Sequence, residues 1–207
     1  MRRYSVLVGL LFLTAGSALA QGEFPKVETA PAFMFIHTTP PGAGQGVNCA
    51  GGGGTIAYNL TSVLGIAADL GGCKIFGYLP SGSTLASKIT GNEFTYLFGP
   101  RITFRNSSPF RPFFDLNFGG ARVSLKCNDN TACSGTSFSR NAFAMTVGGG
   151  FDIKISKKFS LRPIQAEYLY TRFGNSCPYT VCTTNNNQNS FRLKSGIVMA
   201  WGSKSSN

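Results

Sequence analysis

The sequence predicts an all-β protein, in which eight antiparallel strands close into an up-and-down barrel. Three observations support this. Apolar residues recur with a period of two in one segment after another, while the 3.6-residue period of an amphipathic helix does not persist anywhere. Short turns alternate with long connections along the chain. The chain also holds 26 glycines, and aromatic and charged residues each make up 13% of it, whereas soluble domains have about 25% charged residues.

The first twenty residues have the layout of a secretory signal peptide. Two arginines precede a short apolar run, and Ala18-Leu19-Ala20 supplies the small residues of a cleavage site. The apolar run is about ten residues long, too short for a membrane-spanning helix, which needs about 20. We therefore expect residues 1–20 to be removed and residues 21–207 to form one barrel domain.

The first three strands are predicted over 27–37, 53–60 and 64–71. Pro31 weakens the first prediction, because proline cannot donate a hydrogen bond to a ladder. In the third segment every second residue from Leu64 to Leu70 is apolar, and the residues between them are small or acidic. This alternation is typical of a strand with two unlike faces.

The other five strands show the alternation more strongly, and are predicted over 93–104, 110–123, 142–155, 163–173 and 191–201. The stretch EFTYLFGPRITF, residues 93–104, has Phe, Tyr, Phe, Pro, Ile and Phe at its even-numbered positions. The positions between them include Glu93, Gly99 and Arg101. Each strand therefore has one apolar, largely aromatic face and one face of small residues and single charges.

The connections alternate in length. Tight turns are predicted at 59–62, 105–109 and 156–159. Long connections rich in Gly, Ser, Thr and Asn are predicted at about 39–51, 73–91, 125–140 and 174–189. Since strands joined by tight turns form antiparallel hairpins, all short turns lie at one end of the barrel and all long connections at the other.

Residue size and the positions of the acids indicate which face points into the barrel. An eight-stranded barrel has an interior just wide enough for side chains to fill, so small residues fit there and stacked aromatic rings would overfill it. Six of the eight acids lie on the small-residue face, where enclosed charges need partners of opposite sign. The predicted lumen charges are Asp69, Glu93, Arg101, Arg111, Asp115, Asp152, Lys154, Glu167, Arg192 and Lys194.

The aromatic face is therefore expected to contact hydrocarbon, which makes the fold a transmembrane β-barrel. The alternative is a soluble barrel of the lipocalin kind, which would turn the aromatic face inward around a ligand. Basic residues at both rims, among them Arg105 and Arg162 at the short-turn end, are expected to extend toward lipid phosphates.

The last predicted strand resembles the C-terminal recognition signal of outer-membrane proteins. In KSGIVMAW, residues 194–201, a glycine follows two residues after a polar residue, and apolar residues then alternate. Gly196, Met199 and Trp201 carry this signal. Residues 202–207 follow Trp201, where many proteins with this signal end on the aromatic residue itself.

Through its topology, the strands containing GPRITF and RPIQAEYLYTRF, and this terminal signal, the chain resembles the small eight-stranded outer-membrane β-barrel family typified by the barrel of outer membrane protein A and its adhesin-like relatives. The resemblance implies an integral outer-membrane protein, with roles that range from envelope integrity to adhesion. We expect a monomer with extracellular long loops and periplasmic termini. Its expected partners are outer-membrane lipid, lipopolysaccharide and, during insertion, the barrel assembly machinery.

All six cysteines map to the end with the long connections. An exported compartment permits disulfides, and closeness along the chain favours two bonds within single loops, which leaves Cys49 and Cys73 to join the first loop to the second. The predicted pairs are Cys49–Cys73, Cys127–Cys133 and Cys177–Cys182. The alternative, a zinc site, has poor ligand spacing and no nearby histidine, so we expect neither a metal nor a cofactor.

The residues give little support to an enzyme. Two known kinds of small outer-membrane barrel act on lipid A and need a histidine, but the one histidine here, His37, has no serine partner in a recognisable motif. We therefore expect no catalytic residues. The formal charge of +11 suits an anionic membrane surface at least as well as nucleic acid, and we expect no nucleic-acid partner.

Two functions of different class remain open. In the first, the barrel is a closed scaffold that supports envelope integrity or surface binding through its loops. In the second, it is a narrow pore for ions or small solutes.

Overall fold

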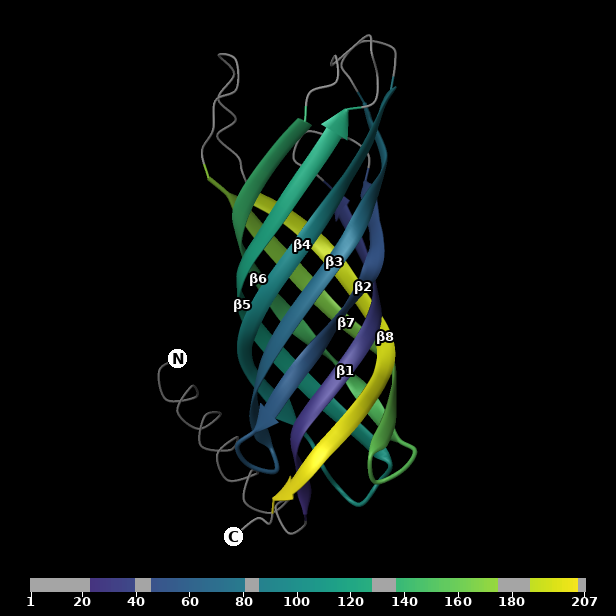
Figure 1. The fold of residues 1–207 in the computed structure, drawn as a ribbon, viewed down its shortest axis with the longest axis vertical. Helices are drawn as coiled ribbons and strands as arrows, with labels where there is room; N and C mark the ends of the chain where they lie inside the picture. The colour runs from purple at the N-terminus through teal and green to yellow at the C-terminus, as the bar shows by residue number, and fades with distance from the viewer. Residues whose placement is uncertain (1–22, 40–45, 81–85, 128–136, 175–186, 205–207) are drawn as a thin grey trace, which may run out of the picture.

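The computed structural model describes residues 23–39, 46–80, 86–127, 137–174 and 187–204. These residues form a closed barrel whose strands are tilted around its long axis (Figure 1). The strands are β1 (Phe24–Thr39), β2 (Val47–Asn59), β3 (Leu64–Pro80), β4 (Ala86–Thr103), β5 (Phe110–Cys127), β6 (Ser137–Lys154), β7 (Phe159–Phe173) and β8 (Asn187–Lys204). Among the described residues, no helix is long and apolar enough to cross a membrane.

Each strand pairs antiparallel with its neighbours in the chain, and β1 pairs with β8 to close the barrel. The prediction of eight strands with up-and-down topology is therefore confirmed. Closure matters because hydrocarbon offers no hydrogen bonds, so a sheet that spans a membrane cannot leave an edge unpaired. The short connections 60–63, 104–109 and 155–158 lie at the end where β1 begins and β8 ends (Figure 1).

The strands extend further toward the long connections than predicted. β2 begins at Val47 rather than at Gly53, and the connection predicted at 73–91 is shortened to 81–85 because β3 runs to Pro80 and β4 begins at Ala86. Backbone pairing needs no apolar side chains. In these extensions the buried apolar residues Val47, Cys49, Cys73 and Ile75 face the lumen and Lys74 faces outward. This reverses the pattern lower on the strands, where apolar residues face outward.

The two faces of each strand are oriented as predicted, with the aromatic face outward. Phe98 is 64% exposed, whereas its neighbour Leu97 is 1% exposed and points into the lumen. On β8 the outward apolar residues run from Phe191 to Trp201. With a rise of about 3.3 Å per residue and a tilt of about 40°, this run covers about 25 Å along the barrel axis, the height of the apolar band of transmembrane barrels.

Three prolines interrupt the ladders without breaking the strands. The β1–β8 register has no partner at Pro31, and the β4–β5 register has none at Pro100. At Pro163 the β7–β8 register shifts between Arg162 and Gln165. Proline lacks the N–H that a ladder requires, and at Pro163 the result is a bulge. Because a bulge inserts an extra residue, both Arg162 and Gln165 point into the lumen.

Gly99 is a position where the wall of the barrel requires glycine. A Cβ built on Gly99 lies 2.0 Å from the carbonyl oxygen of Leu116 on the neighbouring strand, whereas a Cβ on the outward Gly72 has its nearest contact at 3.6 Å, with Phe94. We expect Gly99→Ala to lower the free energy of unfolding by about 1–3 kcal/mol, and Gly72→Ala to change it by less than about 0.5 kcal/mol. Urea titration followed by the fluorescence of Trp201 measures both values. Equal unfolding midpoints for the two variants would contradict the close approach at Gly99.

Candidate functional site

The lumen contains a set of buried ion pairs, which we call the lumen charge network. Its side chains come from β1, β3, β4, β5, β6, β7, β8 and the β4–β5 turn, so it crosses the interior rather than following one hairpin. The acids are Glu28, Asp69, Asp115, Asp152 and Glu167, and the bases are Arg101, Arg105, Arg162, Arg192 and Lys194.

The centre of the network is a cluster of two acids and two bases. Glu167 and Arg192 are directly opposite in the β7–β8 ladder, and Arg192 Nε donates to Glu167 Oε2 at 2.7 Å. Arg192 Nη2 also lies 3.0 Å from Asp69 Oδ1. Lys194 Nζ contacts the Asp69 carboxylate and lies 3.4 Å from Glu167 Oε2. Since Asp69 comes from β3, these contacts bridge strands that are not neighbours in the wall.

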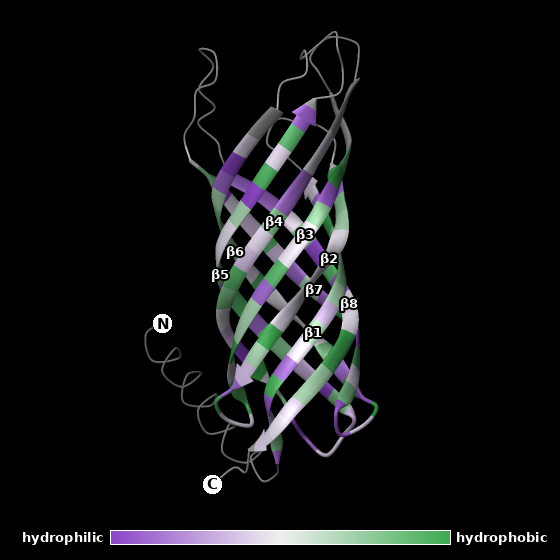
Figure 2. Ribbon diagram, in the orientation of Figure 1, coloured by the Kyte–Doolittle hydropathy of each residue, from purple (hydrophilic) through white to green (hydrophobic). Residues whose placement is uncertain are grey.

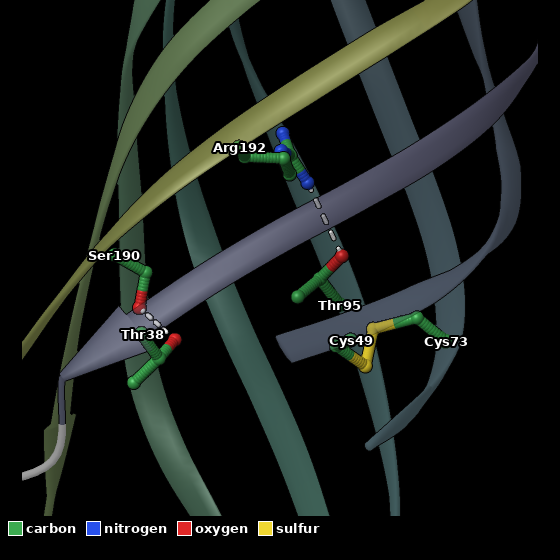
Figure 3. The surroundings of a disulfide bond; sticks show 6 residues. All are labelled: Thr38, Cys49, Cys73, Thr95, Ser190 and Arg192. Carbon is green, nitrogen blue, oxygen red and sulfur yellow. Dashed lines mark hydrogen bonds between the residues drawn. A yellow bond between two sulfur atoms is a disulfide. The ribbon is translucent and has the colours of Figure 1, made fainter. Parts of the chain in front are cut away.

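This central cluster is almost completely shielded from solvent. Arg192 is 0% exposed, and Asp69 and Glu167 are each 1% exposed. Two hydroxyl groups complete its shell. Thr55 donates to Asp69 Oδ2 at 2.9 Å, and Arg192 Nη1 donates to the Thr95 hydroxyl at 3.3 Å (Figure 3). Asp69 Oδ1 and Arg192 Nη2 are close enough for an ion pair but make no hydrogen bond among the described residues. The cluster is therefore held by charge pairing as well as by hydrogen bonds.

A second cluster is built from two arginine–carboxylate pairs around one aromatic ring. Arg101 donates to Asp115 through two bonds of 2.7 and 2.6 Å, and Arg162 donates to Asp152 through two bonds of 2.7 and 2.9 Å. Both guanidinium groups also lie near the ring of Phe113, at 4.7 and 4.2 Å from its centroid. Bidentate hydrogen bonding to a carboxylate and the cation–π contact with Phe113 together fix the orientation of each guanidinium group.

Gln165 connects the two clusters. Its side-chain Nε2 donates to Glu167 Oε1 at 3.1 Å and to Asp115 Oδ2 at 3.3 Å. Its Oε1 accepts a bond of 3.0 Å from Arg162 Nη1. The amide therefore makes one continuous polar network from β3 and β8 through to β4 and β6.

A third part of the network, the ion pair between Arg105 and Glu28, lies at the short-turn end of the lumen. Arg105 Nη2 donates to Glu28 Oε2 at 2.9 Å, and Arg105 Nη1 donates to the carbonyl oxygen of Ser62 at 2.6 Å. Asn59 Nδ2 also donates to the Glu28 carboxylate, at 3.3 Å. The turn between β4 and β5 is thereby joined to β1 and to the turn between β2 and β3.

The structure brings most of the predicted lumen charges together. Lys154, however, is exposed, because it is the last residue of β6 and lies beyond the enclosed part of the lumen. Arg111 is only partly buried and lies opposite Asp152 in the β5–β6 ladder, but Asp152 pairs with Arg162 instead. Glu93 is 6% exposed and makes no ion pair among the described residues. The predicted charges within the network are Asp69, Arg101, Asp115, Asp152, Glu167, Arg192 and Lys194.

Two arginines expected to extend toward lipid at the rim belong to the network instead. Strict alternation along β7 places Arg162 on the lipid side, but the bulge at Pro163 turns its side chain inward. An arginine directly before a proline within a strand is the sequence signal that could have indicated this. Arg105 bends back over the end of the lumen, where its Nη2 forms an ion pair with Glu28.

Above the network, toward the long connections, the lumen is filled by apolar side chains, which we call the apolar plug. Its members come from β1 to β7, and Leu125 and Phe173 pack against it. One buried acid, Glu93, lies beside the plug, with a carboxylate oxygen within 4.8 Å of the sulfur atoms of Cys49 and Cys73. The plug consists of Met34, Ile36, Val47, Cys49, Cys73, Ile75, Leu97, Ala121, Val123, Ala142, Ala144 and Leu169.

The Cys49–Cys73 disulfide lies inside the barrel rather than between two loops (Figure 3). Both cysteines are strand residues because β2 and β3 extend beyond their predicted ends. Cys49 opposes Ile75 in the β2–β3 ladder, so the disulfide joins diagonal positions on the inward face. Cys133, Cys177 and Cys182 lie outside the described residues, and only the backbone of Cys127 is described, so the other two pairs stay predictions.

A metal site at this disulfide lacks thiolate ligands. The ligand atoms of Cys49, Cys73 and Glu93 lie within 4.8 Å of one another. Both sulfur atoms are already bonded to each other, and a thiolate is the form of cysteine that binds a metal. His37 faces outward, where its Nδ1 lies 2.8 Å from Asn48 Oδ1.

The residues of the predicted assembly signal lie along the β1–β8 seam. A Cβ on Gly196 would lie 2.1 Å from the carbonyl oxygen of Pro31. Met199 opposes Thr29 in the β1–β8 ladder. Trp201 faces outward, and its Nε1 donates to the Thr29 hydroxyl at 3.0 Å. Recognition by the assembly machinery stays a prediction.

Removing only one partner of a buried ion pair is expected to destabilise the folded barrel. We expect Arg101→Met to lower the free energy of unfolding by about 3–5 kcal/mol, because it leaves the Asp115 carboxylate buried without its base. Replacing both partners, as Arg101→Met with Asp115→Leu, should recover most of that loss. Urea unfolding in lipid vesicles measures the difference, and the exposed Lys154→Met serves as the control. Unfolding of Arg101→Met at the wild-type urea concentration would refute the role of the pair.

Comparison with known proteins places this barrel among outer-membrane proteins. No curated protein sequence matches the chain significantly. Neisserial surface protein A is 13% identical, with a TM-score of 0.57 over 87% of this chain and 100% of its own. Ail, the attachment invasion locus protein of Yersinia pestis, is 14% identical, with a TM-score of 0.51 over 86% and 99%. OprG of Pseudomonas aeruginosa is 13% identical, with a TM-score of 0.51 over 87% and 96%. The sequence profile of the outer membrane protein beta-barrel domain matches residues 5–196, so the chain belongs to this family of outer-membrane proteins.

Proposed function

We propose that this protein is a non-enzymatic, non-conducting scaffold of the outer membrane, which supports the envelope and holds its long connections at the cell surface for binding. In this proposal residues 1–20 are removed, residues 21–207 form the barrel domain, and both ends of the barrel domain face the periplasm. The short turns then lie on the periplasmic side and the long connections on the extracellular side, the usual arrangement of such barrels.

The observation that carries this proposal is the filled lumen. An ion that crossed the barrel would meet two obstacles in series: the contacts of Arg192 with Asp69 and Glu167 and, above them, the apolar plug. Displacing a buried ion pair costs several kcal/mol, and an apolar layer offers an ion no replacement for its water. Eight-stranded barrels leave no channel once side chains fill them.

The names of structurally similar barrels support a role at the cell surface. Ail is named as an attachment invasion locus protein, and one of its structures, with a TM-score of 0.51 to this chain, holds a heparin analogue, sucrose octasulfate. Neisserial surface protein A is named for its location. These names motivate the surface-binding part of the proposal, while the closed lumen carries the scaffold part.

Conductance across a planar bilayer tests the closed lumen directly. We expect the wild-type protein to give no steady current, because both obstacles are intact. A variant with Glu167→Ala and Arg192→Ala removes the central contacts but leaves the apolar plug in series, and is therefore also expected to give no steady current. A porin inserted under the same conditions controls for the bilayer. Steady current through the wild-type barrel would overturn the scaffold and favour the narrow pore.

A further inference from the structure

We propose that an outward patch on β3–β6 binds the phosphate groups of lipopolysaccharide in the outer leaflet. We call it the basic patch, and it consists of three exposed cations with exposed or partly exposed amides and hydroxyls between them. Its placement in the outer leaflet rests on the orientation proposed above. The basic patch comprises Lys74, Asn92, Arg122, Ser124, Lys126, Ser139 and Asn141.

The distribution of acids leaves the cations of the basic patch without partners in the wall. Six acids point into the lumen and are at most 7% exposed. The remaining described acid, Glu23, precedes β1 and so lies at the other end of the barrel. Among the described residues, no acid forms an ion pair with Lys74, Arg122 or Lys126. Within the described part of the wall these three cations are therefore open to anions from outside it, while Asp129 lies outside the described residues.

The ladders hold the basic patch in a fixed arrangement. Lys74 opposes Asn92, Asn92 opposes Ser124, and Ser124 opposes Ser139 on successive strands. Strands lie about 4.8 Å apart and rise about 3.4 Å per residue. The Cα of Lys74 therefore lies about 12 Å from that of Arg122 and about 12 Å from that of Lys126. Three long side chains at this spacing can reach two phosphates of one large headgroup.

Hydroxyl contacts already orient one of the cations. Arg122 Nε donates to the Ser139 hydroxyl at 3.3 Å, and the hydroxyl oxygens of Ser139 and Ser124 lie 3.2 Å apart. The Nη groups of Arg122 keep their hydrogen-bond donors available, since no contact with them occurs among the described residues. A guanidinium held by one edge presents its other donors to a phosphate, which it can bind with two parallel bonds.

The depth of the basic patch identifies its occupant as a lipid headgroup. Phe94 lies opposite Arg122 in the β4–β5 ladder, and Phe143 lies two residues below Asn141 on β6. Both aromatic side chains are about half exposed, at 49% and 50%, and belong to the lipid-facing band. In Figure 2 the hydrophilic colour gathers on β5 and β6 where they approach the long connections. The patch therefore borders the hydrocarbon, where the anions are the phosphates of lipids.

On the rest of the barrel, the upper edge of the lipid-facing band has uncharged polar side chains instead of cations. On β8, β1 and β2 this edge is formed by uncharged side chains that hydrogen-bond to one another or to the tyrosines of β7. Arg172 of β7 lies next to the basic patch. These contacts occupy the polar groups, so this side offers an anion little. The pairs are Tyr168–Asn189 at 2.6 Å, Tyr170–Asn187 at 2.9 Å and His37–Asn48 at 2.8 Å.

The test uses the full-length barrel in nanodiscs of zwitterionic phosphatidylcholine and measures binding of added lipid A. We expect the variant with Lys74→Ala, Arg122→Ala and Lys126→Ala to bind lipid A about a hundredfold more weakly than wild type, because each basic residue near an anionic membrane surface contributes about a factor of five. The matched control removes three exposed cations at the other end, as Lys26→Ala, Lys157→Ala and Lys158→Ala, and should bind as wild type. Heat-dependent mobility on gels verifies that each variant is folded.

Two further probes separate phosphate recognition from general attraction. Dephosphorylated lipid A should lose binding to the wild-type protein, and phosphatidylglycerol should bind it much more weakly than lipid A. Unchanged binding by the triple variant, or equal binding of phosphatidylglycerol, would overturn the proposal. Two other measurements test the proposed function independently of lipid A binding. Steady current across a bilayer would show that the lumen is open. Protection of the long connections from protease added to whole cells would show that they do not face the outside.

Discussion

The pairing of charges within a closed wall is the constraint on which this structure depends. Enclosing an acid away from bulk water is costly unless a base lies within reach. Five of the six lumen acids form an ion pair, and Glu93 is the exception among the described residues. Arg192 between Glu167 and Asp69 satisfies two acids from opposite parts of the wall. The network therefore sets which strands face each other across the lumen, beyond what the ladders between neighbours determine.

The same constraint explains how the chain divides its chemistry between the lumen and the outer surface. Acids are placed inside, where they meet arginines, and the excess of basic residues is left on the rims, where solvent and lipid headgroups meet the wall. The apolar plug and the Cys49–Cys73 disulfide fill the lumen where the charges end. A filled interior suits a scaffold that presents its connections, and the external charge suits an anionic leaflet.

Alternation along the chain predicted the strands, the topology and the outward aromatic face, because a period of two depends only on the local geometry of a strand. It could not place Arg162, since one extra residue at Pro163 reverses the alternation. It also placed Cys49 and Cys73 in loops, because in the upper parts of β2 and β3 the apolar residues face inward, the reverse of the pattern lower on the strands. Pairing across the lumen, as between Asp69 and Lys194, depends on tertiary geometry that no local pattern contains.

Labelling with a lipid-soluble carbene probe in vesicles, read by mass spectrometry, tests the enclosure of the charges most directly. If the wall separates hydrocarbon from a sealed charged lumen, the probe modifies the outward residues Phe98, Phe143 and Phe191 and spares the inward residues Leu97 and Leu169. Modification of Leu97 and Leu169, with Phe98 reached instead by water-soluble reagents, would contradict the account.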